Sequence, residues 1–273
     1  SQERRSGEWV ANRYELVSVL GRGGMGSVWL ARDTKLNRDV AIKFMLEADE
    51  ELLRRFEREA EIAAQLRTRH VVEVYDHGLD GGAPYMVMEC LHGESLSQVL
   101  RREGRLSVAQ VTFIVEQVGR ALGVAHRARV VHRDLKPGNI FVAQDADDTE
   151  TVKIVDFGIA KDRAAEPGEA TVTGTILGSP FYMSPEQARG VREVDGRADL
   201  WSLAVVAYRA LTGDKPFVGA TIVDLLMQIC STAPPKASAL CPDLPTDFDL
   251  FFERALQAEP EHRFQDIDAF VIV

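Results

Sequence analysis

Residues 132–139 read His-Arg-Asp-Leu-Lys-Pro-Gly-Asn, and Asp-Phe-Gly follows at residues 156–158. The first segment brings a carboxylate, an ammonium and an amide into one loop, and the second adds a carboxylate directly after a predicted strand. Amide and carboxylate oxygens suit Mg²⁺, which proteins usually hold through one or two carboxylates together with substrate phosphates. Asp-Phe-Gly alone is common by chance, but the two segments at this distance are not. Together they predict a magnesium and phosphate site.

A glycine-rich segment lies far upstream, Gly-Arg-Gly-Gly-Met-Gly-Ser-Val at residues 21–28. Glycines let a turn bend tightly and bring backbone N–H groups close to phosphates without interference from a Cβ atom. A dinucleotide-binding fold carries a similar motif but continues into a helix, whereas Ser27 begins a strand-like run. The motif therefore favours a strand–loop–strand cover over phosphates, with a plain glycine-rich hairpin as the simpler alternative.

Lys43 interrupts the apolar, strand-like run at residues 40–44. Side chains alternate along a strand, so Ala41 and Lys43 share the face over which the glycine-rich loop would fold. A buried ammonium needs an anion nearby. Taken alone, Lys43 would be explained better as a strand-end lysine that extends to water.

The helix predicted for residues 48–67 offers the missing anion. Its apolar stripe recurs at steps of three and four residues, at Leu52, Phe56, Ala63 and Leu66. Glu59 occupies the gap in this stripe, which turns its carboxylate towards the core. An ion pair with Lys43 explains two otherwise costly residues together. A half-exposed Glu59 that needs no partner is the alternative.

The predicted elements divide the chain into two parts. Strand-like runs rich in β-branched and aromatic residues dominate the first part, and they cover residues 14–20, 27–31, 40–44, 71–75 and 85–88. Helical patterns dominate after Gly93, and Ser107 with Gln110 forms a predicted capping box. Two short strands, at 140–142 and 152–155, enclose an acidic hairpin tip. The simplest architecture is α+β, with a mostly β small lobe joined to a helical large lobe.

The composition is that of an ordinary globular protein, with 45% hydrophobic and 27% charged residues among 273. A formal net charge of −10 argues against non-specific binding to nucleic acid or anionic membrane. Three cysteines far apart predict neither a disulfide framework nor a zinc site, and a reducing cytoplasm fits best. No apolar run approaches the roughly 18 residues of a membrane span. Because the chain starts at Ser1 and stops in the apolar run 270–273, we expect both ends to be cuts from a longer protein.

Taken together, the motifs resemble those of eukaryotic-like (Hanks-type) serine/threonine protein kinase catalytic domains, particularly the bacterial branch. They occur in the order of that family, and the resemblance runs from about Tyr14 to Phe270. It implies an antiparallel-sheet N-lobe with one regulatory helix at residues 10–91, a mainly helical C-lobe at 92–273 and a loose tail at 1–9. It also implies transfer of the γ-phosphoryl group of ATP, with Mg²⁺, to serine or threonine hydroxyls of protein substrates.

The resemblance assigns a role to each matching residue of the catalytic centre. Asp134 would accept or orient the proton of the acceptor hydroxyl, and Lys136 would stabilise charge on the γ-phosphoryl group. Lys43, paired with Glu59, would hold the α- and β-phosphates. The implied magnesium ligands are Asn139 and Asp156.

The resemblance also places the nucleotide. Adenine would hydrogen-bond to the backbone of Glu89 and Leu91, with Met88 as the gatekeeper side chain. Apolar side chains of both lobes would enclose the ring, and the glycines would cover the phosphates. The implied nucleotide-binding residues are Leu20, Gly21, Gly23, Gly26, Val28, Ala41, Lys43, Met88, Glu89, Leu91 and Phe141.

Three residues of the large lobe match structural positions of the family. Glu186 and Arg263 correspond to its buried ion pair, and Asp199 to the residue that braces the catalytic loop. A helix N-cap would also explain Asp199. Small departures from the family pattern leave the chemistry untouched; they are Arg129, Ser184, Ala204 and Arg209.

A segment with threonines among small residues and glycines precedes the Ser-Pro-Glu motif at 184–186. A phosphate there would add about −1.5 to −2 charge and could hydrogen-bond to cations such as Arg133 and Lys161. We therefore expect autophosphorylation to order this activation segment, with incidental threonines in a flexible loop as the alternative. The candidate phosphosites, in order of preference, are Thr173, Thr171 and Thr175.

Two rival functions share parts of this pattern. A pseudokinase or scaffold would have the same fold, but it usually lacks the strand lysine, the loop aspartate or the Asp-Phe-Gly aspartate, and all three are present here. A small-molecule phosphotransferase with a kinase-like fold would lack the extended segment at 178–186 that shapes a peptide groove. Within that segment Ser179 resembles the pattern of serine/threonine-specific kinases.

The expected partners are ATP and protein substrates, with no nucleic acid. Arg13 and Asp76 resemble positions that bacterial relatives use for a weak homodimer through the N-lobe, with two ordinary exposed charges as the alternative. We expect the chain to be cytoplasmic, including as the cytoplasmic domain of a membrane-anchored receptor kinase. Membrane contact is expected only through segments outside this chain.

Overall fold

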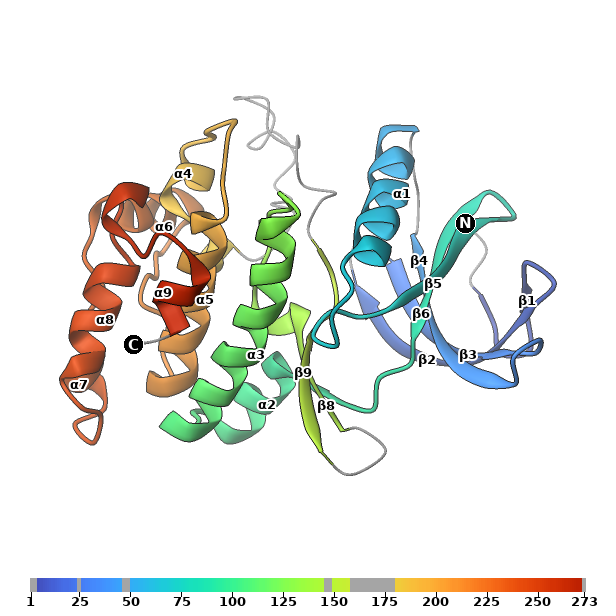
Figure 1. Cartoon of the computed structure of the whole chain (residues 1–273), viewed down its shortest axis with the longest axis horizontal. Helices are drawn as coiled ribbons and strands as arrows, with labels where there is room; N and C mark the ends of the chain where they lie inside the picture. Colours follow the sequence, from blue (N-terminus) through green and yellow to red (C-terminus); the bar gives the residue numbers. More distant parts are fainter. Residues whose placement is uncertain (1–3, 24–25, 46–49, 145–148, 158–179, 272–273) are drawn as a thin grey trace.

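The structure, a computed structural model, describes residues 4–23, 26–45, 50–144, 149–157 and 180–271. Its N-terminal part is built on an antiparallel sheet, and its C-terminal part is a group of helices (Figure 1). The sheet has six strands in the order β1-β2-β3-β4-β6-β5. Their bounds are β1 Trp9–Val10, β2 Tyr14–Gly23, β3 Gly26–Asp33, β4 Arg38–Met45, β5 Val74–Asp80 and β6 Ala83–Glu89.

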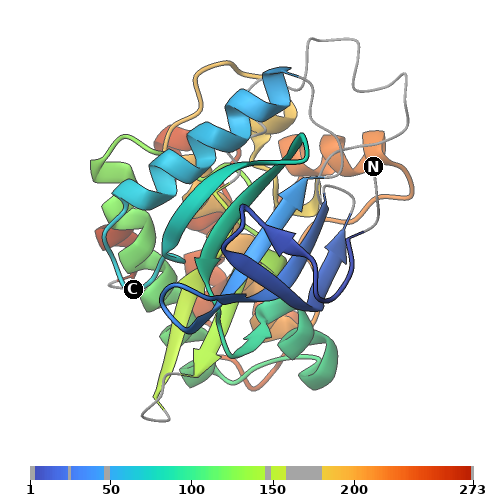
Figure 2. The same cartoon turned by 90° about the vertical axis from the view of Figure 1, so that its right-hand side faces the viewer.

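The alternation of side chains along β4 and β6 gives this sheet two apolar faces. One face carries a cluster that includes Tyr14, Trp29 and Ile42. The other carries the cluster of Ala41, Met45, Phe56, Ala60, Val72, Met86 and Met88. Phe56 and Ala60 belong to helix α1, Glu50–Gln65, which lies across the sheet (Figure 2). The helix thereby fixes where Glu59 meets the strand that carries Lys43.

A second, three-stranded sheet begins the C-terminal part, with β7 Gly93–Ser95, β8 Ile140–Gln144 and β9 Glu150–Ile154. Its order is β7-β8-β9. The two parts are tied along β9, because the N–H of Val72 donates to the carbonyl of Ile154 and the N–H of Ile154 donates to the carbonyl of His70, both at 2.9 Å. This pairing explains why the strand predicted at 71–75 begins only at Val74.

Helices fill the rest of the described chain and surround a buried centre. The longest are α3 Val108–Arg127 and α5 Arg197–Thr212, and α5 is buried along nearly its whole length. Trp201 of α5 is fully buried and stacks on Phe217 with ring centroids 5.5 Å apart. The other helices and 3-10 turns (η) are α2 Leu96–Glu103, η1 Pro137–Asn139, η3 Pro180–Tyr182, α4 Pro185–Ala188, α6 Ile222–Ser231, α7 Ala237–Leu240, α8 Asp247–Ala255, η4 Pro260–His262 and α9 Ile267–Val271.

The α+β class predicted from the sequence is confirmed, and the local differences have clear causes. The capping box forms, because Ser107 accepts from the N–H of Gln110 while the Gln110 side chain accepts from the N–H of Ser107. Strand β1 was not predicted, since two residues carry no alternation to detect. Val108, the first residue of α3, is 37% exposed, because it lies in the first turn. The exact lobe limits stay predictions.

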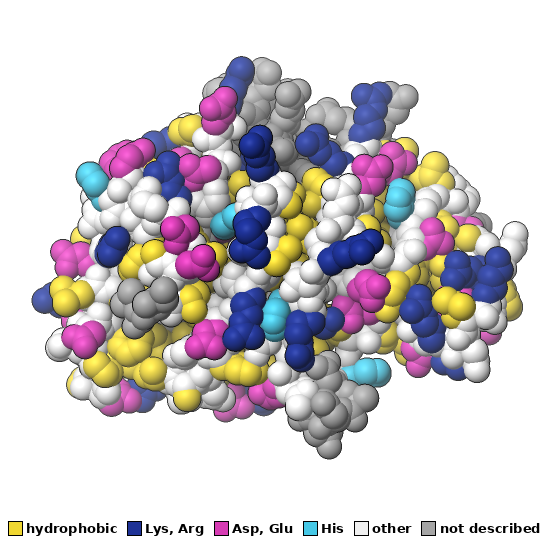
Figure 3. Space-filling view, in the orientation of Figure 1, with side chains coloured by type: hydrophobic (Ala, Val, Ile, Leu, Met, Phe, Trp, Pro, Cys, Tyr) yellow, Lys and Arg dark blue, Asp and Glu magenta, His cyan; other side chains and the backbone are white. Residues whose placement is uncertain are grey.

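The described surface shows no single dominant charge on the side drawn in Figure 3, where basic and acidic side chains are interspersed. Within the described residues, no helix is long and apolar enough to cross a membrane.

Candidate active site

The 132–139 loop is held from beneath by one buried carboxylate. Asp199 is fully buried, and it accepts the backbone N–H groups of His132 and Arg133, each at 2.9 Å. The same carboxylate lies 2.8 Å from Nε2 of His126 in α3. Asp199 sits inside the first turn of α5, and the N-cap residue is Gly196. The N-cap alternative for Asp199 is therefore wrong, and the residue braces the loop.

Arg133 adopts a left-handed backbone conformation, with φ of 62°. A non-glycine residue in this region is strained by about 1–3 kcal/mol and persists only where its surroundings fix it. Here Asp199 holds its N–H, and Nε2 of Gln187 donates to its carbonyl at 2.8 Å. These two hydrogen bonds fix the backbone on both sides of Arg133, directly before Asp134.

Asp134 has two close partners in its own loop. Nζ of Lys136 lies 2.8 Å from its Oδ2, and Nδ2 of Asn139 donates to its carbonyl at 3.0 Å. Because the donor end of the Asn139 amide is used inside the loop, its oxygen is the end that it can offer to a cation. The N–H of Val155 donates to the carbonyl of Asn139 at 3.0 Å, which sets Asp156 beside this amide.

Lys43 connects the sheet to this loop region. Its ammonium lies 2.8 Å from Oδ1 of Asp156 and 3.6 Å from Oε1 of Glu59. Burial lowers the pKa of Lys43, but the two carboxylates outweigh burial, so its pKa lies above the ordinary value and the ammonium stays charged. Burial raises the pKa of Glu59 to about 7, against the opposing charge of Lys43. The shorter distance indicates that Asp156 is the stronger partner of the lysine.

The predicted adenine pocket is assembled in part by one apolar cluster. Val28 and Leu91 pack against the cluster that contains Ala41 and Met88, and Ala41 and Met88 face each other across β4 and β6. Leu20 is 53% exposed on β2 and, like Phe141 of β8, does not belong to this cluster. The structure therefore gathers four of the six predicted apolar residues, while the other two lie on separate strands, β2 and β8.

The glycine-rich segment belongs to two paired antiparallel strands, because β2 ends at Gly23, β3 starts at Gly26 and these two residues pair. The dinucleotide-binding alternative, which needs a helix here, is thereby excluded. Gly26 has φ of 154°, and a Cβ atom on it would lie 1.8 Å from the carbonyl oxygen of Phe44. Gly21 and Gly23 have no atom within 4 Å of such a Cβ. Gly26 is thus needed for strand packing, whereas Gly21 and Gly23 have open space around them.

Asn139 and Asp156 fit the role of magnesium ligands by their chemistry. Both offer oxygen atoms, and the hydrogen bond between Val155 and Asn139 keeps them adjacent. Mg²⁺ needs only one or two protein carboxylates, because water and substrate phosphates complete its octahedral shell. A small donor set of this kind suits a metal that arrives with a nucleotide.

One contact at the junction of the two parts was missed by sequence reasoning. Nζ of Lys153 in β9 lies 2.6 Å from Oε1 of Glu89 at the end of β6, and the same oxygen accepts the N–H of Glu73 at 2.8 Å. Glu89 was expected to contribute only its backbone. The sequence did carry a signal for this contact, because Lys153 is a charged residue in a predicted apolar strand. The same argument singled out Lys43.

The large-lobe ion pair is bidentate. Nη1 and Nη2 of Arg263 lie 2.9 and 2.8 Å from the two carboxylate oxygens of Glu186. The guanidinium also donates to three backbone carbonyls, and Arg263 is 1% exposed. This pair joins α4 to the segment after η4, so it fixes the end of the predicted peptide segment.

Arg13 and Asp76, predicted to serve a dimer, have partners within the chain. Arg13 precedes β2 and makes two hydrogen bonds to Asp33, at 3.0 and 2.7 Å. Asp76 accepts the hydroxyl of Tyr14 at 2.9 Å. In a dimer through these residues, Arg13 and Asp76 would have to bind the second chain while keeping or giving up these contacts. The dimer stays a prediction. The candidate phosphosites Thr171, Thr173 and Thr175, together with Lys161 and Ser179, lie outside the described residues.

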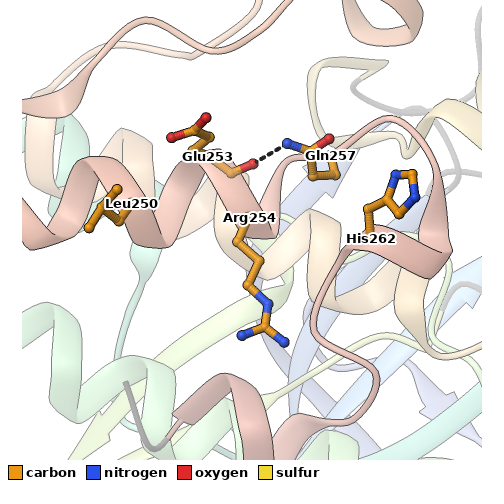
Figure 4. A pocket seen from close by; sticks show the side chains of 5 residues that line it. All are labelled: Leu250, Glu253, Arg254, Gln257 and His262. Atoms are coloured by element: carbon orange, nitrogen blue, oxygen red, sulfur yellow. Dashed lines mark hydrogen bonds between the residues drawn. The ribbon is translucent and has the colours of Figure 1, made fainter.

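A surface hollow lies in the C-terminal part, on α8, η4 and the segment between them. It is lined by Leu250, Glu253, Arg254, Gln257 and His262 (Figure 4). Two of these side chains are already engaged, since Nε2 of Gln257 donates to the carbonyl of Glu253 at 2.9 Å and Arg254 stacks over Phe264. No catalytic candidate lines this hollow, so it is not part of the candidate active site.

Comparison with known proteins agrees with this geometry. The family described as "Protein kinase domain" matches residues 14–269. The chain belongs to the protein kinase family. The family recognised from the motifs is thereby confirmed, and the two-part fold is that of a kinase domain.

Among its relatives, the kinase domain is 39% identical over 269 residues to the serine/threonine-protein kinase PknA of Mycobacterium tuberculosis, covering 96% of this chain and 60% of that protein. It is 39% identical over 263 residues to PknB of the same species, covering 94% of this chain and 41% of that protein. A probable serine/threonine-protein kinase of Clostridium acetobutylicum is 36% identical over 263 residues, covering 95% of this chain and 39% of that protein. The chain thus spans 60% or less of the length of these three relatives.

Proposed function

We propose that this kinase domain transfers the γ-phosphoryl group of ATP to serine or threonine hydroxyls of protein substrates. The observation that carries the proposal is the 2.8 Å ion pair between Lys43 and Asp156. It joins the strand under the glycine-rich turn to the segment that adjoins Asn139 and Asp134. The proposal gives these neighbouring side chains their roles: a lysine for phosphates, two oxygen ligands for magnesium and an acceptor carboxylate.

In the proposed reaction, the protein acts mainly by positioning and by electrostatic stabilisation. Lys43 binds the α- and β-phosphates, and Glu59 keeps its ammonium oriented. Asn139 and Asp156 hold the magnesium, which supplies neutralising charge at the phosphate oxygens when it is bound. The adenine hydrogen-bonds to the backbone of Glu89 and Leu91.

The acceptor hydroxyl lies against Asp134 in this proposal. The carboxylate accepts or orients its proton, and Lys136, 2.8 Å from the same carboxylate, stabilises charge on the transferred group. Lys136 and the sequence position of Ser179 both resemble the serine/threonine-specific pattern. The names of the relatives, PknA and PknB among them, support the same acceptor class.

Activation by autophosphorylation is a second part of the proposal. The threonines at 171, 173 and 175 precede the peptide segment, and Arg133 adjoins the catalytic Asp134. A phosphate on this cluster would add charge-assisted hydrogen bonds to nearby cations. Burial lowers the pKa of Arg133, and the carboxylate of Asp199 opposes this shift, so a further anion would favour its charged form.

A pseudokinase or scaffold with the same fold is the alternative. Asp134→Asn separates the two functions, because it removes the acceptor base while leaving the nucleotide contacts intact. We expect kcat for a basic test protein to fall by about 10²–10⁴, the usual effect of a general acid–base group, with unchanged ATP affinity. Asp39→Asn, which alters only an exposed pair with Arg32, is the control and should retain full turnover.

The outcome decides between the candidates. Absence of phosphoryl transfer by the unaltered domain, with ATP still bound, would favour the scaffold. Phosphoamino-acid analysis should give phosphothreonine and phosphoserine. A Thr171→Ala, Thr173→Ala, Thr175→Ala variant should bind ATP and lose most peptide phosphorylation, and unmodified threonines in fully active enzyme would contradict the regulatory part.

A further inference from the structure

Four helices of the described chain begin with a capping box, and one of these boxes reaches beyond its own helix. The pairs are Ser95 with Gln98, Ser107 with Gln110, Ser184 with Gln187 and Thr221 with Asp224. In each pair, the side chain of the second residue accepts the backbone N–H of the first. Asp224 shows that the cap needs only an acceptor. The amide nitrogen of a glutamine at this position is therefore not required by the cap.

Gln187 uses this second end of its amide. Its Oε1 accepts the N–H and the hydroxyl of Ser184, at 3.1 and 3.2 Å, which completes the cap of α4. Its Nε2 donates to the carbonyl of Arg133 at 2.8 Å. The two ends cannot be exchanged, because a backbone N–H needs an acceptor and a carbonyl needs a donor. Among the described residues, Gln98 and Gln110 make no such second hydrogen bond, and both side chains are exposed.

The carbonyl that accepts this bond lies directly before Asp134. Arg133 has a left-handed φ of 62°, and such a conformation persists only where the surroundings fix it. Asp199 of α5 holds its N–H at 2.9 Å, and Gln187 of α4 holds its carbonyl. Loss of the second bond would leave a partly buried carbonyl unpaired and would relax the peptide unit that joins Arg133 to Asp134. The position of the Asp134 carboxylate is therefore coupled to α4.

Helix α4 is itself anchored in the large lobe. Glu186, next to Gln187, forms the buried bidentate pair with Arg263. The chain directly before α4 is held as well, because the hydroxyl of Ser202 in α5 donates to the carbonyl of Tyr182 at 2.8 Å. These residues belong to the segment 178–186, which we expect to shape the peptide groove. Gln187 thus connects a fixed part of the peptide segment to the loop that carries the acceptor carboxylate.

We propose that Gln187 is a positioning residue that aligns the acceptor hydroxyl of a protein substrate with Asp134. This inference rests on the proposed kinase function and deepens it. The peptide segment holds the substrate, Asp134 orients the proton of its hydroxyl, and Gln187 fixes the one relative to the other. A misplacement of about 1 Å can lower a rate by about 10²-fold. Water, the acceptor in the slow hydrolysis of ATP, needs no alignment with the peptide segment.

The ratio between these two reactions tests the proposal. In this ratio, kcat for a threonine-containing peptide is divided by kcat for ATP hydrolysis without peptide. Unfolded molecules lower both values equally, so a merely structural role does not change the ratio. Gln187→Glu keeps the acceptor of the cap and removes the donor to Arg133. We expect this variant to lower the ratio by about ten- to a hundredfold, with an unchanged KM for ATP.

A second variant controls for the charge of the new carboxylate. Gln187→Met is neutral and of similar length, and it removes the same donor. It should lower the ratio by a similar factor, although α4 also loses its cap acceptor. Gln110→Glu and Gln110→Met make the same changes at an exposed capping box without a second hydrogen bond. Both control variants should keep the original ratio.

An unchanged ratio in Gln187→Glu would overturn the positioning role while leaving the kinase function intact. A fall in Gln187→Glu without a fall in Gln187→Met would assign the effect to the introduced charge and would also overturn it. An equal fall in the Gln110 variants would have the same consequence. If the unaltered enzyme phosphorylates no peptide at all, the proposed function fails, and this inference fails with it.

Discussion

The ammonium of Lys43 lies closer to Asp156 than to Glu59, at 2.8 Å against 3.6 Å. The lysine is therefore neutralised chiefly by the carboxylate that we assign to magnesium. In the proposed function, nucleotide binding would redistribute these contacts, because Asp156 would be a magnesium ligand and Lys43 would bind the phosphates. Glu59 then becomes the only carboxylate of the three-residue group left to orient the lysine.

Glu59→Gln should consequently affect catalysis more than folding. We expect kcat/KM for ATP to fall by about tenfold or more, since the lysine loses its orienting charge when Asp156 engages the metal. Folding should not suffer, because Lys43 keeps Asp156 as a partner. Steady-state kinetics together with thermal unfolding would check both parts. An equal loss of stability and activity would contradict this division of roles.

The same variant carries a pH signature. Burial raises the pKa of Glu59 to about 7, above the ordinary value of about 4.3. A carboxyl with a raised folded pKa stabilises the fold at low pH, and this contribution is lost as pH rises through about 7. The free energy of unfolding of Glu59→Gln, measured relative to that of the unaltered protein, should therefore rise by roughly 1–3 kcal/mol as pH increases from 5 to 8. Denaturant unfolding at several pH values measures the difference, and a pH-independent difference would refute it.

His132 should produce the opposite dependence. The ring is fully buried against Phe157, and burial lowers its pKa although nearby carboxylates oppose the shift. A histidine with a lowered pKa stabilises the fold above its unfolded pKa of about 6.5, and that stability is lost as pH falls below it. His132→Phe should remove this part of the acid destabilisation. His77→Phe, which alters an exposed ring on β5, should retain the original acid dependence.

The contact between Glu89 and Lys153 predicts a link between the two lobes and the nucleotide. Lys153→Met leaves Glu89 with the N–H of Glu73 but without its cation, at a cost of about 1–3 kcal/mol for this partly buried pair. Because the backbone of Glu89 is proposed to bind adenine, ATP affinity should fall several-fold. Calorimetric titration with ATP measures this effect. Lys153→Arg keeps the charge, so a loss of the same size there would argue against the ion pair.

The sequence predicted the helices, the strands and the types of catalytic residue better than it predicted which side chains contact one another. Lys43 and Glu59 could be paired because each broke a local pattern at a known periodicity. The competition of Asp156 for Lys43 could not be foreseen, since it depends on how the end of β9 meets β4. Likewise, the predicted start of a strand at Val71 was wrong. The segment 70–72 pairs with β9 instead, and a local sequence pattern does not encode such a long-range contact.

Arg263 and Glu186 allow the sharpest test of how the large lobe is held. The pair is bidentate and buried, so removing one partner leaves an unpaired charge in the interior, which costs about 3–5 kcal/mol. Arg263→Met should therefore destabilise the domain by that amount. Adding Glu186→Gln should recover part of the loss, because the uncompensated carboxylate disappears.

The pair of Arg189 and Glu259 is a matched control, since both of its side chains are about half exposed. Arg189→Met should cost at most about 1 kcal/mol. Chemical unfolding of the single and double variants completes the cycle, and strictly additive losses for Arg263 and Glu186 would show that the pair is not coupled.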